Sequence, residues 1–349
     1  MSDPYPLYTT SYTLHRLSPL HTPAPLLLPP LAKRLQDTLA NTLRGVQLET
    51  PENTSAAGAL RQIAWEWLGD EARWAREHPP DSDDEEQEET LPPLPPLDPA
   101  DAKGMLLRLH YERATYIAVF LRSARGPAVK GFTPFPLLAT RMPAGTRTAL
   151  LAFISETFDA RVGACALSSS FMAQRLETLV AGYEGEGWDV QKGLAVQIAF
   201  PSAGGLVRGV NVTLQSGDLA GFVERGREGE EMREGRGVVG PFTRGLDAYL
   251  RTHMAFSLAG SGTQFARFAF GPVALGAEGR VNVLTASGLG RGVWDALVLE
   301  AETQFDGAAE EGVKSEFEVV ERARGRTMES LPSEPPPPYE LHDPARSGR

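Results

Sequence analysis

Residues 7–20 read LYTTSYTLHRLSPL, a run in which larger side chains alternate with small polar ones. Tyr8, Thr10, Tyr12 and Leu14 occupy every second position, which is the period that places side chains on one face of a β-strand. Ser18-Pro19 follows, and proline ends the strand because it has no N–H to donate to a neighbouring strand. The stretch therefore predicts a strand at the start of the chain.

The residues after this strand predict a mixed first part, residues 1–77 and 101–182. Leucines at 31, 35, 39 and 43 behind a Pro-Pro pair predict a helix over about 30–43. Residues 59–77 are amphipathic and fit either a helix or a strand. Residues 105–111 and 115–122 predict paired strands, and 144–158 predict a helix. Ser168 to Ser170 are natural N-caps for a further helix.

A second, sheet-rich part is expected over residues 186–321, after a glycine-rich boundary at 182–187. Clean alternation predicts strands over 194–200 and 210–214. A Gly-rich charged loop is expected over 224–237, and a helix around 246–254. Short strands are expected near 264–270, 280–285 and 293–300. The fold class is therefore α+β, in two strand-rich parts.

Two segments are expected to be disordered because they are rich in proline and charge and poor in apolar residues. They are an acidic insertion, 78–100, and a tail, 322–349. Seven acids lie between Asp81 and Glu89, and removing them from the net charge of −11 leaves −4. A nearly balanced folded part neither demands nor forbids nucleic acid as a partner. Ser82, before three acids, has the context of an acidophilic-kinase site or of a plain solvated loop.

The sequence offers no assembled catalytic motif and predicts no cofactor or metal. Neither a P-loop nor a Gly-x-Ser-x-Gly elbow occurs, and glycines at 288–292 fit a flexible turn. Cys165 is the single cysteine, which excludes an internal disulfide and fits a reducing compartment; a buried, inert thiol is the expected state. No secretory signal or membrane span is expected. An enzyme with an unfamiliar motif stays an alternative.

Two patterns point to binding. Arginine far exceeds lysine, which suits phosphate contacts or a plain solvated surface. The candidate DNA-contact residues are Arg122, Arg125, Lys130, Arg141 and Arg147. In the tail, Pro336-Pro337-Pro338-Tyr339 matches the P-P-x-Y ligand of WW domains, with Pro336, Pro337 and Tyr339 as contact residues. This motif predicts an alternative role, as an adaptor for a WW-domain ubiquitin ligase.

The N-terminal motif Leu14-His15-Arg16-Leu17-Ser18-Pro19-Leu20 resembles the start of fungal CENP-L-like proteins, which are subunits of the inner kinetochore. FTPFPLLATRMP (132–143) with LLAFISETFDARV (150–162), and more loosely FARFAFGPVALGAEGRVNVL (265–284), are similar to further family segments. The resemblance implies an α+β fold of the RdgC/CENP-L type in a nuclear scaffold. It also implies pairing with a CENP-N-like protein through the C-terminal sheet, near CENP-A nucleosomes and other inner-kinetochore subunits, where a basic channel can contact DNA. Self-association without that partner is left open.

The resemblance and the alternating pattern together place a candidate partner interface in residues 265–285. A sheet edge can accept a partner strand without any catalytic residue. The candidate partner-binding residues are Phe268, Phe270, Val281 and Val283.

Overall fold

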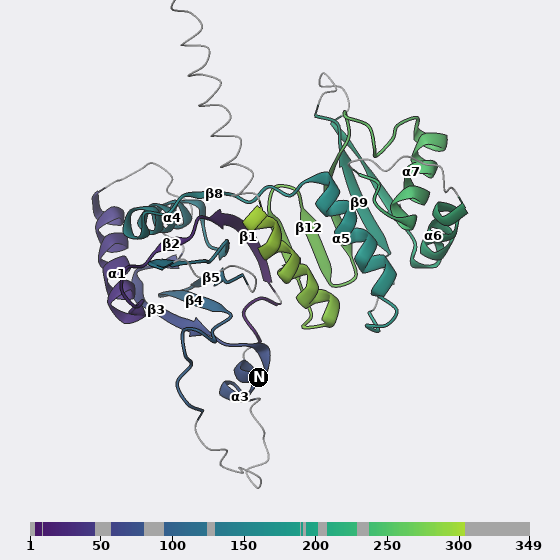
Figure 1. The fold of residues 1–349 in the computed structure, drawn as a ribbon. Helices are drawn as coiled ribbons and strands as arrows, with labels where there is room; N and C mark the ends of the chain where they lie inside the picture. The colour runs from purple at the N-terminus through teal and green to yellow at the C-terminus, as the bar shows by residue number, and fades with distance from the viewer. Residues whose placement is uncertain are drawn as a thin grey trace, which may run out of the picture. The chain divides into compact units, whose positions relative to one another are not determined.

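The computed structural model describes residues 4–8, 10–45, 57–79, 94–123, 130–188, 190, 193–201, 208–228 and 237–303. These residues belong to one compact unit, Met1–Phe305. Within it the α+β prediction is confirmed, because helices flank a large antiparallel sheet (Figure 1).

The first part of the chain supplies one half of this sheet. Its strands are β1 (Thr10–Leu17), β3 (Leu60–Leu68), β4 (Gly104–Tyr111), β5 (Thr115–Leu121), β7 (Leu137–Arg141) and β8 (Val162–Ala164). Short β2 (Leu20–His21) pairs with β6 (Phe132–Thr133) in a separate sheet. The helices are α1 (Leu28–Gly45), α3 (Glu71–Glu77), α4 (Ala144–Phe158) and α5 (Ser169–Gly182). The predicted β4–β5 pair and the Ser168 cap of α5 are both confirmed.

The second part supplies the other half. Its strands are β9 (Leu194–Ala199), β10 (Gly209–Leu214), β11 (Gln264–Phe270), β12 (Val273–Gly276) and β13 (Arg280–Val283). A 3₁₀ turn, η1 (Ser216–Asp218), leads into α6 (Leu219–Glu228), and α7 (Pro241–Met254) follows. Residues 288–303 form the last described helix.

Strand β1 joins the two halves. The strand order is β10-β9-β11-β12-β13-β1-β7-β5-β4-β3, with β8 also paired to β1. Thr13 is opposite Arg280 of β13 on one side and opposite Thr140 of β7 on the other. The opening strand thus belongs to the middle of the sheet. One sheet runs through both parts of the chain. The division of the chain near residue 182 therefore stays a prediction.

Two hydrophobic cores lie on opposite faces of the sheet. Along β5, Val119 and Leu121 belong to one core, while Ala118 and Phe120 belong to the other. The first core is covered by α5, α6, α7 and residues 288–303, and the second by α1 and α4. Helices α1 and α4 lie together in Figure 1. Since the second core includes no residue of β9 to β13, the described helices leave the corresponding face of the C-terminal half open.

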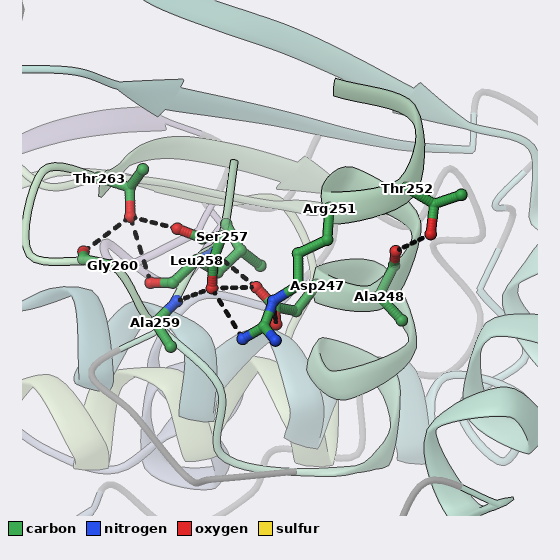
Figure 2. Close-up of polar contacts among 9 residues, drawn as sticks. All are labelled: Asp247, Ala248, Arg251, Thr252, Ser257, Leu258, Ala259, Gly260 and Thr263. Atoms are coloured by element: carbon green, nitrogen blue, oxygen red, sulfur yellow. Dashed lines mark hydrogen bonds and ion pairs between the residues drawn. The ribbon is translucent and has the colours of Figure 1, made fainter. Parts of the chain in front are cut away.

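Helix α7 ends in a cluster of buried polar contacts around Asp247 (Figure 2). The Asp247 side chain is 1% exposed, and its Oδ1 accepts hydrogen bonds from the Ser257 hydroxyl at 2.8 Å and the Leu258 N–H at 2.6 Å. Its Oδ2 lies 2.9 Å from Nε of Arg251. Ala255 ends the helix in the left-handed region, at φ 58°. These contacts fix the chain reversal that leads into β11.

Several predictions need correction. Residues 293–300 are helical, not a strand, because the buried side chains Val293, Trp294, Leu297, Val298 and Ala301 follow helical spacing. Residues 288–292 form the first turn of this helix, and not a flexible turn. Residues 224–228, expected in a loop, belong to α6. The stretch 59–77 contains both a strand, β3, and a helix, α3. Most of 78–100 and all of 322–349 lie outside the described residues.

Candidate functional site

The four predicted partner-binding residues lie in the interior of the protein. Phe268 and Phe270 on β11 and Val281 and Val283 on β13 are at most 1% exposed, and all belong to the core beneath the helices. Both strands are paired on both sides. A direct partner contact would require the covering helices to move, so a role in partner binding stays a prediction and would be indirect.

The free edge of the C-terminal half is β10, which among the described strands pairs with β9 alone. The Arg208 carbonyl accepts a hydrogen bond from the Phe200 N–H at 3.0 Å. Because hydrogen-bonded and outward-facing residues alternate in an antiparallel pair, Gly209, Asn211 and Thr213 direct their backbone N–H and C=O groups away from β9. All three residues are also exposed.

The opposite edge of the sheet, β3, is blunted in ways that β10 is not. Arg61 and Glu66 on β3 form ion pairs of 2.5 Å with Glu112 and Arg108. A register irregularity lies between Leu60 and Gln62, and α1 packs against the strand. Charges, bulges and covering helices all protect an edge from pairing with another chain. In contrast, β10 reads GVNVTL, without charge or proline.

The predicted DNA-contact residues have different surroundings. Arg122 is already used by the fold: it donates to the Ala100 carbonyl at 2.9 Å, and its guanidinium carbon lies 5.3 Å from the Phe135 ring centroid. Lys130 and Arg141 are exposed, and Arg147 is partly exposed on α4. Arg125 lies outside the described residues, as do Pro336, Pro337 and Tyr339.

The open face of the C-terminal half carries residues that the sequence reasoning missed. Arg267, Gly276 and Arg280 are opposite one another across β11, β12 and β13, and both arginines are exposed. The exposed row continues through Gln197 on β9 to Asn211 on β10. The alternation in QFARFAF could have identified this face, because an arginine between phenylalanines on a strand indicates the solvent-facing side.

Burial shifts the pKa values of two interior titratable groups away from their ordinary ranges. Burial raises the pKa of the Cys165 thiol to about 11, with the Glu300 carboxylate adding to the shift. Burial also lowers the pKa of His15 to about 4, helped by the Arg147 guanidinium. Among the described residues no group of three or more His, Cys, Asp or Glu side chains could hold a metal ion. No helix in the described ranges is long and apolar enough to cross a membrane.

Comparison with known proteins bears on these surfaces. The family model for CENP-L, Centromere protein L, matches residues 6–325, which is most of the chain. No curated protein matched it. The resemblance of the N-terminal motif to this family thus extends through both halves of the sheet. The chain belongs to the centromere protein L family, whose members are nuclear components of the centromere and kinetochore that serve chromosome segregation in cell division.

Proposed function

We propose that this chain is a non-enzymatic structural subunit of the inner kinetochore that pairs with a CENP-N-like protein through the edge strand β10. The pair would link CENP-A chromatin to other kinetochore subunits. The observation that carries the proposal is a contrast between the two edges of the sheet. Strand β10 carries no charge or proline and pairs with β9 alone among the described strands, whereas β3 is charged, bulged and covered by α1.

Pairing at β10 would extend the sheet into the partner. Outward N–H and C=O groups of Gly209, Asn211 and Thr213 supply main-chain affinity, as in other cases where a strand is added to a sheet edge. Specificity would come from the side chains beside the edge. In this arrangement Phe268, Phe270, Val281 and Val283 support the edge from within, since they hold β11 and β13 against the helices.

Charge substitutions at Val281 or Val283 cannot test the proposal, because a charge buried in this core would unfold the half-sheet. Amide hydrogen exchange of the chain, alone and in complex with a CENP-N-like protein from the same organism, is the sharper experiment. We expect the amides of Gly209, Asn211 and Thr213 to become strongly protected in the complex and those of β3 to be unchanged. Protection of β3 instead, or of neither edge, would refute pairing at β10.

Direct DNA contact by this subunit is a separate proposal. Lys130, Arg141 and Arg147 keep some exposure and are the remaining described candidates, whereas Arg122 is engaged by Ala100 and Phe135. Removing a basic side chain that binds a phosphate reduces the steepness of the salt dependence of binding. Binding of duplex DNA by the complex should therefore lose salt sensitivity in the triple glutamine variant at 130, 141 and 147. An unchanged slope would remove these residues from the interface.

The alternative function is an adaptor for a WW-domain ligase, supported by the motif Pro336-Pro337-Pro338-Tyr339. Deleting residues 330–349 separates the two functions. The scaffold would still co-purify with inner-kinetochore subunits from nuclear extract, whereas the adaptor would lose its ligase. A tag purification with mass spectrometry of both forms makes the comparison.

A further inference from the structure

Dipeptides of serine or threonine with proline gather at one corner of the second core. The sequence contains four of them, at Ser18, Thr22, Thr50 and Thr133. Thr50 lies outside the described residues. The other three lie in or beside the short paired strands β2 and β6. Proline-directed protein kinases recognise a Ser-Pro or Thr-Pro dipeptide, so this corner is a candidate site of phosphorylation.

Thr22 directly follows β2, and both its backbone and its side chain contact the β6 region. Its N–H donates to the Gly131 carbonyl at 2.7 Å. Its Oγ1 lies 2.7 Å from Oγ1 of Thr133, so the two hydroxyls share a hydrogen bond. The ladder between β2 and β6 has only two residue pairs. A pairing this short opens locally at a much lower free energy than the large sheet does.

The residues that follow Thr22 are accessible to a kinase. Proline-directed kinases contact mainly the proline and the residues after it, and they bind this stretch as an extended chain. Thr22 is half-buried, whereas Pro23, Ala24 and Pro25 are exposed. Residues 22–27 belong to no helix or strand. A kinase can therefore draw the stretch after Thr22 into an extended shape without breaking secondary structure.

The other two described dipeptides are held firmly in the fold. The Ser18 hydroxyl accepts a hydrogen bond from the Arg161 N–H at 2.9 Å, and two residues later Leu20 is fully buried. Two residues after Thr133, Phe135 is likewise fully buried in the second core. A kinase that bound either dipeptide would have to pull a core residue out of the protein. The structure therefore favours the remaining dipeptide, Thr22-Pro23.

We propose that a proline-directed protein kinase phosphorylates Thr22 and that the phosphate holds β2 and β6 apart. The Thr22 hydroxyl oxygen attacks the γ-phosphorus of ATP, the bond from that phosphorus to the β,γ-bridging oxygen breaks, ADP leaves, and the hydroxyl proton passes to the kinase's catalytic base. The new group carries about two negative charges and three acceptor oxygens. It does not fit where the Thr22 and Thr133 oxygens lie 2.7 Å apart, so their shared hydrogen bond is lost. The site does not depend on pairing at β10.

The test treats the folded full chain with a cyclin-dependent kinase, Mg²⁺ and ATP, and follows each site by mass spectrometry. Synthetic peptides with one dipeptide each give the rates without the fold. Thr22 in the chain should keep at least about a tenth of its peptide rate, while Ser18 and Thr133 should fall about 100-fold or more below theirs. Pro23→Ala should abolish phosphorylation of Thr22. Pro25→Ala, also at an exposed proline, is the matched control and should leave it unchanged.

Hydrogen exchange of the Thr22 amide measures the opening of the corner, because this N–H is bonded to the Gly131 carbonyl in the closed form. Phosphorylation should speed its exchange about tenfold or more and leave the amides of β4 unchanged. Kinase-treated Thr22→Val, which has no hydroxyl, should exchange as before treatment. The proposal is overturned if the folded chain is not phosphorylated at Thr22, if Ser18 or Thr133 is modified as readily, or if exchange of the Thr22 amide does not change.

Discussion

Glu177 of α5 holds Thr243 at the start of α7: its Oε2 accepts hydrogen bonds from the Thr243 N–H at 3.0 Å and from the hydroxyl at 3.1 Å. The Phe242 N–H donates to Oε1 at 2.8 Å. Glu186 accepts similarly from Gly288 and Leu289, which begin the last described helix. One carboxylate on α5 and one just beyond its end therefore cap two later helices from outside, which fixes their positions relative to the sheet.

Glu177→Ala should lower the free energy of unfolding by about 2 kcal/mol, since helix N–H groups then lose their acceptors in a partly buried place. Urea unfolding of both proteins measures the change. Glu156→Ala, on the exposed face of α4, is the control and should stay within about 0.5 kcal/mol of the wild type. Equal effects of the two substitutions would show that the cap contributes nothing.

Ala255→Gly should stabilise the protein by about 0.5–1 kcal/mol. Ala255 ends α7 at φ 58°, a left-handed conformation that a Cβ disfavours and glycine adopts without strain. Figure 2 shows the adjoining polar contacts around Asp247. Ala248→Gly within the same helix provides the control and should destabilise by about 1 kcal/mol. A lower thermal unfolding midpoint for Ala255→Gly would contradict the assigned left-handed geometry.

His15 should make the protein less stable in mild acid. The pKa of His15 is lowered to about 4, so between pH 6.5 and 4 the unfolded chain binds a proton that the native protein excludes. Stability is therefore full above the unfolded pKa and falls as the pH falls, with about 3 kcal/mol lost from this residue by pH 4. His15→Gln should flatten the pH profile of unfolding, whereas His253→Gln, at an exposed site, should leave it unchanged.

Cys165 should be unreactive in the native protein. It is fully buried, and its pKa is raised to about 11, so little thiolate is present or accessible at pH 7.5. Labelling with iodoacetamide should be at least about 100-fold slower than in urea-unfolded protein, where the thiol is exposed and has an ordinary pKa. Rapid native labelling would instead reopen the possibility of a functional thiol.

Local pattern predicted local structure well. Helix 144–158 is predicted by Leu150, Ile154 and Phe158 at i+4 spacing, and the strands near 194–200 and 210–214 by clean period-two alternation. The strand predicted over 293–300 was wrong, because the buried residues Val293, Trp294 and Leu297 follow helical spacing. Residues 59–77 could not be assigned because Gly69-Asp70 divides the stretch into a strand and a capped helix.

Non-local features were beyond sequence reasoning. That Thr13 would lie between Arg280 and Thr140, far along the chain, depends on pairings that alternation alone does not specify. The same limit affected the candidate site. Alternation identified Phe268 and Phe270 as one face of a strand but could not say that α5 covers it. Which strand ends a sheet is likewise set by the whole topology.

The most direct test of the account is the affinity of an edge variant for a CENP-N-like protein, measured by calorimetry. Asn211→Pro removes an outward N–H from β10 and spares the ladder with β9, because proline is tolerated where a strand's N–H faces solvent. Asn211→Ala keeps that N–H and is the matched control. The account predicts at least a tenfold loss of affinity for Asn211→Pro and little change for Asn211→Ala. Wild-type affinity of a folded Asn211→Pro variant would contradict pairing through β10.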